Sequence, residues 1–107
     1  MQNKTTKFLL DLGVPPHMNG FKYARTAILE LIQTPNSNHR WCELYEKIAE
    51  QHSTTGKRVE RSIRHSIEKT QETGAVKYCN IFPNNIISKP PTGQFLATVA
   101  EIVKMED

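Results

Sequence analysis

Apolar side chains recur at intervals of three and four residues along most of the chain, which is the spacing of one face of an α-helix. This pattern predicts a short first helix over residues 6–12, which Gly13 and the two prolines after it would end. A second helix is predicted to start at Asn19, a residue suited to the N-cap, and residues 34–38 have the composition of a loop. The predicted apolar stripe of this second helix consists of Phe21, Ala24, Ile28, Leu31 and Ile32.

Two further helices are predicted on either side of a very short break. The first of them begins at Trp41, and the break is expected at residues 51–53. The second runs to about residue 73, with Ser53 or Thr54 as its N-cap and Gly74 directly after its end. The apolar stripe of the first consists of Trp41, Leu44, Tyr45, Ile48 and Ala49, and that of the second of Val59, Ile63, Ile67 and Thr70.

The C-terminal part of the chain has a less regular pattern. Residues 75–90 contain prolines and an Asn-Asn pair among scattered apolar positions, which predicts a loop with one short helix. Thr92 is placed to cap a last helix. The apolar stripe of that helix consists of Phe95, Leu96, Val99, Ile102 and Val103. The sequence has no convincing strand pair or hairpin turn, so we expect an all-α fold, a compact bundle of about six helices that forms a single domain over residues 1–107.

Length and composition exclude two broad classes of protein, those that span a membrane and those that are secreted. The longest apolar runs are far shorter than the roughly 20 residues that a membrane span needs, and the N-terminal segment has no apolar stretch of signal-peptide length. Only two cysteines, Cys42 and Cys79, are present, too few for a disulfide framework, so both are expected to be reduced. We therefore expect no membrane association.

The net charge of +3 is concentrated in one short segment. Residues 57–65 hold four basic side chains and one acidic one, whereas the other 98 residues carry equal numbers of each. Because this segment opens the second of two helices separated by a short break, residues 41–73 are interpreted as a helix-turn-helix. Ala49, which is small, and Val59, which is β-branched, stand where two steeply crossing helices would approach each other closely.

The polar face of the basic helix carries groups that can read DNA. The arc that points outward holds Lys57, Arg58, Glu60, Arg61, Arg64 and His65. Arginine can donate two hydrogen bonds to guanine, and glutamate can accept one from cytosine, so Glu60 would read a base or hold an arginine in position. Ser53, Thr54 and Thr55 lie at the positive end of the helix dipole, where phosphate oxygens bind well. The alternative is that the segment is simply a solvated helix face.

Three blocks of the sequence resemble a known family. Residues 53–68, which include the run VERSIRHSIE, closely resemble the recognition-helix region of the C-terminal effector domain of the sporulation stage zero regulator A, the master response regulator of endospore-forming bacteria. Residues 12–23 resemble the N-terminal signature of that domain, and residues 89–103 resemble its final helix. The resemblance covers about residues 8–104, and it is weak over residues 75–88, where this chain is a few positions shorter.

The resemblance implies a six-helix domain whose third and fourth helices bind double-stranded DNA. The family recognises a short box reading approximately TGTCGAA, often in tandem, with two domains side by side on one face of the duplex. By position, the resemblance implies base contacts from Arg58, Glu60 and Arg61, and phosphate contacts from Ser53, Thr54, Thr55, Lys57, Arg64 and His65. It also implies a cytoplasmic, nucleoid-associated bacterial protein that acts as a homodimer or tandem pair on DNA, with RNA polymerase as a further candidate partner.

The sequence departs from the family pattern in two ways. Gly56 stands where the family tends to have alanine, which loosens the first helical turn by about 1 kcal/mol, and Lys57 stands where a small polar residue is common. The phosphoacceptor receiver domain of the family's regulators is not part of this sequence. We therefore expect either a fragment or a free-standing effector domain that binds DNA constitutively, or under the control of its abundance or of another partner.

Enzymatic and metal-binding functions find little support. The sequence has no Gly-rich phosphate loop, no nucleophile with a base at a known motif spacing and no carboxylate pair in an apolar setting, so neither an enzyme nor a cofactor is predicted. His39, Cys42, His52 and Cys79 lack the paired spacing of zinc ligands, so no metal site is predicted. Cys42 is expected to be a small residue beside the core.

Two functions of different classes remain. The first is a sequence-specific DNA-binding regulator of transcription, which the polar, basic face of the fourth helix favours. The second is an interaction module that keeps the fold but pairs with or antagonises a full-length regulator, without specific DNA binding. A protein-binding surface would more often expose an apolar patch, and the two functions differ in whether Arg58 and Arg61 are needed.

Overall fold

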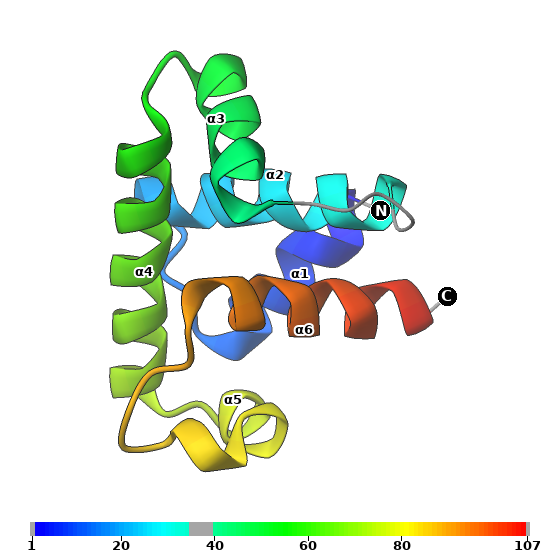
Figure 1. The fold of residues 1–107 in the computed structure, drawn as a ribbon. Coiled ribbons are helices and arrows are strands. Elements are labelled where there is room, and N and C mark those ends of the chain that lie inside the picture. The colour runs from blue at the N-terminus through cyan, green and yellow to red at the C-terminus, as the bar shows by residue number, and fades with distance from the viewer. Residues whose placement is uncertain (1, 35–39, 107) are drawn as a thin grey trace.

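The computed structural model describes residues 2–34 and 40–106 of the chain. These residues form six α-helices and one short 3-10 helix, and Figure 1 shows no strand among them. The elements in chain order are α1 (Gln2–Leu12), α2 (Asn19–Gln33), α3 (Trp41–His52), α4 (Gly56–Thr73), α5 (Val76–Ile81), η1 (Pro83–Asn85) and α6 (Thr92–Met105). The expected all-α fold with about six helices is therefore confirmed.

Helix α2 lies at the centre of the packing, in contact with α1, α3, α4 and α6. Helix α4 runs along one side of the molecule, where it packs against α2, α3 and α6 (Figure 1). Helix α6 starts near α4 and extends away from it, so the C-terminal end of α6 lies on the opposite side of the molecule (Figure 1). One face of α4 is thus part of the core, and the opposite face lies at the surface of the molecule.

The apolar stripes of the long helices form the core, as their spacing predicts. The stripe of α4 is entirely buried, with Val59, Ile63 and Thr70 at 0% exposure and Ile67 at 1%. Four of the five stripe residues of α6 are buried as well, while Ile102 packs against the core from its edge. In α2 the buried surface shifts toward the N-terminal half, because Leu31 and Ile32 are only partly buried.

Several predicted helix boundaries are wrong by a few residues. Helix α1 begins at Gln2 instead of residue 6, and α2 has Met18 at its N-cap, so Asn19 is the first helical residue. The break expected at residues 51–53 lies two residues later, at residues 53–55, because α3 continues through His52. Of the loop predicted over residues 34–38, only Thr34 is among the described residues.

The irregular segment after α4 contains more helix than predicted. Helix α5 and the 3-10 turn η1 occupy part of residues 75–90, and a hydrogen bond from the Tyr78 hydroxyl to the carbonyl of Asn85, 2.9 Å long, joins them. The rings of Tyr78, Phe82 and Phe95 pack in sequence, with centroids 5.2 and 5.3 Å apart. This aromatic packing fixes the segment to α6, and such a long-range contact is not encoded in the local apolar spacing.

Candidate nucleic-acid interface

Three residues join α3 to α4 in a tight turn. Ser53 adopts the left-handed backbone conformation, with φ 55° and ψ 48°, which turns the chain sharply at the end of α3. The backbone N–H of Ser53 and that of Thr54 both donate to the carbonyl of Ala49. The Thr55 hydroxyl then accepts a hydrogen bond from the backbone N–H of Arg58, 3.3 Å long, and so caps α4. The N-cap is therefore Thr55, not Ser53 or Thr54, because Ser53 already serves as the C-terminal cap of α3.

The close approach of the two helices depends on small and β-branched side chains. Ala49 and Val59 are both buried where α3 and α4 meet, as predicted. Gly56, the first residue of α4, lies so close to Glu46 that a Cβ atom at position 56 would be 2.2 Å from a carboxylate oxygen. The two helices lie close together across a short turn, which fits the helix-turn-helix that stays a prediction over residues 41–73.

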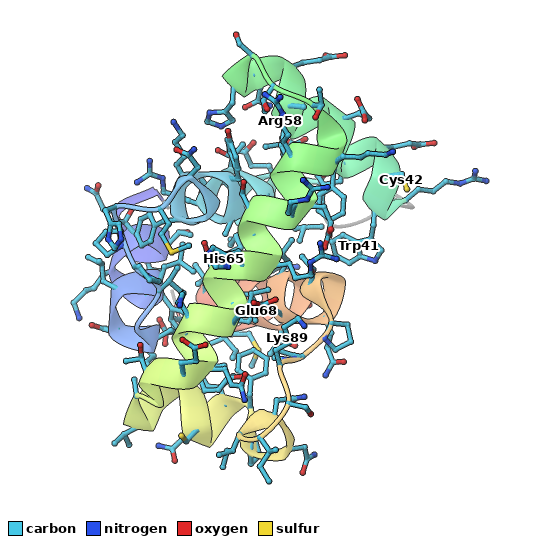
Figure 2. The ribbon with its side chains drawn as sticks, turned by 90° about the vertical axis from the view of Figure 1, so that its left-hand side faces the viewer. Trp41, Cys42, Arg58, His65, Glu68 and Lys89 are labelled. Carbon is cyan, nitrogen blue, oxygen red and sulfur yellow. The ribbon has the colours of Figure 1, made fainter. Side chains whose placement is uncertain are left out.

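The outward face of α4 carries the predicted DNA-binding side chains. Figure 2 looks onto this face, with Arg58 near the N-terminal end of α4 and His65 and Glu68 further along the helix. On α4, the exposed members of the predicted set are Lys57, Arg58, Arg61, Arg64 and His65. They lie on consecutive turns of one helix, so the structure brings them together on a single surface.

The cations on this face differ in whether they are already paired. For Lys57, Arg58 and Arg61, the described part of the chain provides no ion-pair partner. Arg64 lies 3.5 Å from a carboxylate oxygen of Glu60, and Nδ1 of His65 lies 3.8 Å from Glu68. The unpaired cations therefore occupy the N-terminal half of α4, which is the half that enters the major groove in helix-turn-helix proteins.

Glu60 is less exposed than its basic neighbours. Its side chain is 29% exposed, and the Thr92 hydroxyl donates a hydrogen bond of 3.0 Å to Oε2, while Arg64 approaches Oε1. Burial raises the pKa of Tyr45 to about 12, and the nearby charge of Glu60 adds to this effect. Glu60 thus connects the exposed face of α4 with the first residue of α6.

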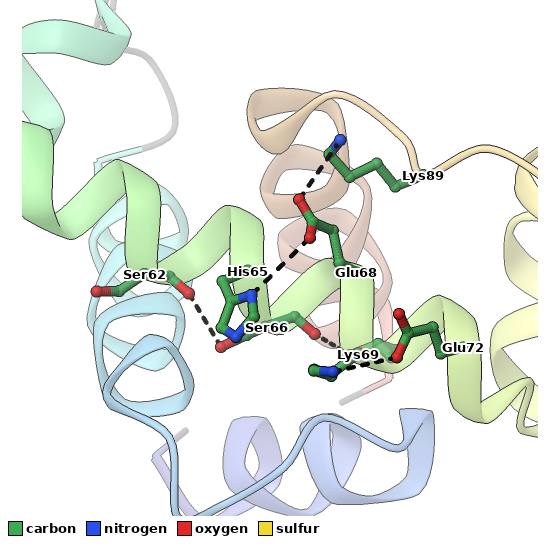
Figure 3. A network of polar contacts seen from close by, with 8 residues as sticks. Ser62, His65, Ser66, Glu68, Lys69, Glu72 and Lys89 are labelled. Carbon is green, nitrogen blue, oxygen red and sulfur yellow. Dashed lines mark hydrogen bonds and ion pairs between the residues drawn. The ribbon is translucent and has the colours of Figure 1, made fainter.

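The second half of α4 holds the segment that leads into α6. Glu68 lies between His65 and Lys89, with its second oxygen 3.6 Å from the Lys89 ammonium (Figure 3). The side-chain amide of Gln71 donates to the carbonyls of Ile86 and Ile87, at 2.8 Å for Ile86. Sequence reasoning missed the contacts with Lys89, Ile86 and Ile87, because the partners are fifteen or more positions apart and share no motif.

The cysteines and histidines do not gather into a metal site in the part of the chain that the structure describes. His39 lies outside the described residues. Cys42 was expected beside the core, but it is exposed on α3, where it lines a groove of about 410 Å³ between α3 and α4. Among the described helices, none is long and apolar enough to cross a membrane.

Comparison with known families agrees with this geometry. Residues 5–103 match the family described as "Sporulation initiation factor Spo0A C terminal". The chain belongs to this family. The match includes all six α-helices except the outer ends of α1 and α6, and it confirms the resemblance of the three sequence blocks.

Membership of the Spo0A C-terminal family gives the chain its general function. The family is the DNA-binding effector domain of a sporulation regulator, so this chain is a DNA-binding domain of transcription regulation. The family is regulatory and is not known as an enzyme. In this Spo0A C-terminal domain, the exposed basic face of α4 is the candidate surface for DNA.

Proposed function

We propose that the domain binds a TGTCGAA-like box by inserting α4 into the major groove, with Arg58, Glu60 and Arg61 at the base edges. The single observation that carries this proposal is the row of cations on the N-terminal turns of α4 for which the described residues provide no ion-pair partner. An arginine that is not paired within the protein can offer two donors to O6 and N7 of a guanine. Glu60 retains acceptor capacity for the N4 amino group of a cytosine, because a carboxylate has about four acceptor sites.

The phosphate contacts would come from residues that flank Arg58, Glu60 and Arg61, both on α4 and in the turn before it. Lys57, Arg64 and His65 are exposed on α4, and Ser53 and Thr55 are exposed at the turn before it. Thr54 is half-buried, and its backbone N–H is already bonded to Ala49, so its hydroxyl is the group available to a phosphate. The N-terminus of α4 adds its partial positive charge at the same place.

The number and arrangement of domains on DNA would follow from the arrangement of the boxes. A tandem box would place two copies of this domain side by side, as a homodimer or tandem pair on one face of the duplex. We further propose that residues 1–107 act as one effector domain in the bacterial cytoplasm, with RNA polymerase as a partner in regulation. The basic face of α4 would be occupied by DNA in that complex, so any protein partner would bind elsewhere on the domain.

The proposal is tested by fluorescence anisotropy with a labelled duplex that carries two tandem boxes and a scrambled duplex of the same length. The titrations are made at two salt concentrations. Specific reading predicts a preference of about a hundredfold or more for the boxes, retained at the higher salt. Equal, salt-sensitive binding to both duplexes would contradict it and would favour the alternative of a protein-interaction module.

Two substitutions on α4 separate base contacts from phosphate contacts. Arg61→Ala is expected to cost about 1–3 kcal/mol of binding free energy and to relax specificity at one base pair. Lys57→Ala is expected to weaken binding to all sequences alike and to lower the salt slope by about one unit. Both are measured by the same titrations over a set of single-base variants of the box. Equal, sequence-independent losses for both variants would refute the direct reading of bases.

A further inference from the structure

The first residue of α6 has a side chain with an unusual partner. Thr92 was predicted to cap α6, but Pro91 occupies the N-cap position, and it makes no side-chain hydrogen bond there. The Thr92 hydroxyl is therefore not used to cap its own helix. It instead donates a hydrogen bond of 3.0 Å to Oε2 of Glu60 on α4, a residue 32 positions earlier in the chain.

The backbone around Thr92 is held firmly in place. A Cβ atom added at Gly93 would lie 2.7 Å from Cε2 and 2.9 Å from Nε1 of Trp41, so the indole ring rests directly on the backbone of α6. The Trp41 ring in turn stacks on Tyr45, with the ring centroids 6.3 Å apart. Because Trp41 and Tyr45 belong to α3, the first turn of α6 is fixed against both helices of the helix-turn-helix.

The contact restricts a side chain that would otherwise be mobile. Glu60 stands among the cations of α4, and a glutamate on a helix surface can pair with residues three or four positions away on either side. Thr92 and Arg64 each approach a different oxygen of the Glu60 carboxylate, at 3.0 and 3.5 Å. With both oxygens held, the carboxylate keeps one orientation relative to α4 and still has free acceptor sites.

We propose that Thr92 is a positioning residue for the recognition of one base pair. From α6, it holds the Glu60 carboxylate in the orientation in which Glu60 reads that base pair. The inference rests on the proposed function of Glu60. It adds that specificity at one position of the box depends on a residue outside the helix-turn-helix, one that itself touches no DNA. A positioned acceptor discriminates better than a mobile one, because less side-chain freedom is lost on binding.

The test uses the whole chain and measures discrimination at each base pair of the box. Glu60→Gln first identifies the base pair that Glu60 reads. Thr92→Val, which removes the hydroxyl at nearly constant volume, is expected to reduce discrimination at that same pair by about threefold to tenfold, which corresponds to the net contribution of one typical hydrogen bond. Thr92→Ser keeps the hydroxyl and is expected to restore discrimination.

Two controls separate positioning from a loss of structure. Thr98→Val makes the same substitution at a half-buried position of α6, where the described residues offer no hydrogen bond, and it is expected to leave discrimination unchanged. In the Glu60→Gln background, Thr92→Val is expected to cause little further loss of discrimination, because the two residues act as one unit.

The outcomes distinguish this inference from the proposed function. If Thr92→Val weakens all duplexes evenly, or if no base pair responds to Glu60→Gln, the positioning role is refuted. If Thr92→Val leaves discrimination unchanged while Arg61→Ala reduces it, the inference fails and the proposed function stands. If Arg61→Ala also leaves discrimination unchanged, it is the proposed function that fails.

Discussion

His52, at the end of α3, shares a hydrogen bond with Thr26 on α2. The Thr26 hydroxyl lies 3.0 Å from the carbonyl of Lys22, to which it donates, and 3.0 Å from Nε2 of His52. When the hydroxyl proton is used for Lys22, Nε2 of His52 is the donor of the second bond. Burial, together with the charges of Lys22 and Arg25, lowers the pKa of His52 below 6.5.

The lowered pKa of His52 predicts a loss of stability in mild acid. Below pH 6.5 the unfolded chain binds the proton more readily than the folded chain, so the free energy of unfolding should fall as the pH falls through this range. At a pH well above 6.5, His52 is neutral in both the folded and the unfolded chain, so none of the free energy of unfolding is lost to its protonation. Urea unfolding at pH 7.5 and pH 5.5 measures the effect. His52→Gln, whose amide can still donate to Thr26, should have a smaller pH dependence, and an equal one would contradict the prediction.

Ser53 has a backbone conformation that suits glycine better. Its φ of 55° is in the left-handed region, where a Cβ atom costs about 1 kcal/mol or more. Gly74 occupies the corresponding position after α4 with φ 64°. We expect Ser53→Gly to raise the free energy of unfolding by up to about 1 kcal/mol, measured by urea unfolding. Ser53→Ala keeps the Cβ atom and serves as the control, and a gain of the same size in Ser53→Ala would contradict this account.

At the scale of elements, α2 and α4 touch backbone to backbone at Gly20. A Cβ atom at this position would lie 2.0 Å from Oγ of Ser66 and 2.2 Å from the carbonyl oxygen of Ser62. The Ser66 hydroxyl could move, but the carbonyl belongs to the backbone of α4 and could not. The glycine therefore sets the distance between the central helix and the basic helix.

Gly20→Ala is expected to push α4 away from α2. The free energy of unfolding should fall by about 1–3 kcal/mol or more, the usual cost of overpacking, and urea unfolding measures it. Ser66→Ala is the matched control, because it removes only the movable contact. The double variant should remain destabilised, and a return to the stability of the unsubstituted chain would show that the carbonyl contact is unimportant.

Local periodicity predicted the long helices well, because each buries one continuous face. Val59, Ile63 and Ile67 are spaced about one helical turn apart, so a helix places all of them on its buried face. The ends of helices were predicted less well. Three consecutive hydroxyl residues precede α4, and only the backbone of Ser53 decides that Thr55 is the cap.

The charges of the candidate site could be predicted from the sequence, but its side-chain contacts could not. Charge density and helical spacing are local properties, so the exposed cations of α4 could be assigned from the sequence. The contacts of Glu60 with Thr92 and of Glu68 with Lys89 join α4 to residues 21 or more positions later. Such pairs depend on where α6 packs, which no local pattern records.

At the scale of the whole molecule, the uneven charge predicts a modest dependence of DNA binding on salt. The excess of positive charge lies within residues 57–65, and those cations are on one face. If two to four of them neutralise phosphates, the logarithm of the binding constant should fall with the logarithm of salt with a slope of about −2 to −4 per domain. Titrations between 50 and 200 mM salt measure it. A slope steeper than about −6 would require basic residues outside α4.

The position of α4 as one wall of the core has a consequence for the DNA. Its buried face is held by α2, α3 and α6 together, so it cannot roll or tilt without opening the interior. A close-packed interior resists such motion. If the domain reads the proposed box, its adjustment to imperfect versions of that box is then expected from the duplex, through groove width, bending and bridging water. Promoters with equal numbers of matched bases would then differ in affinity according to how easily their DNA deforms.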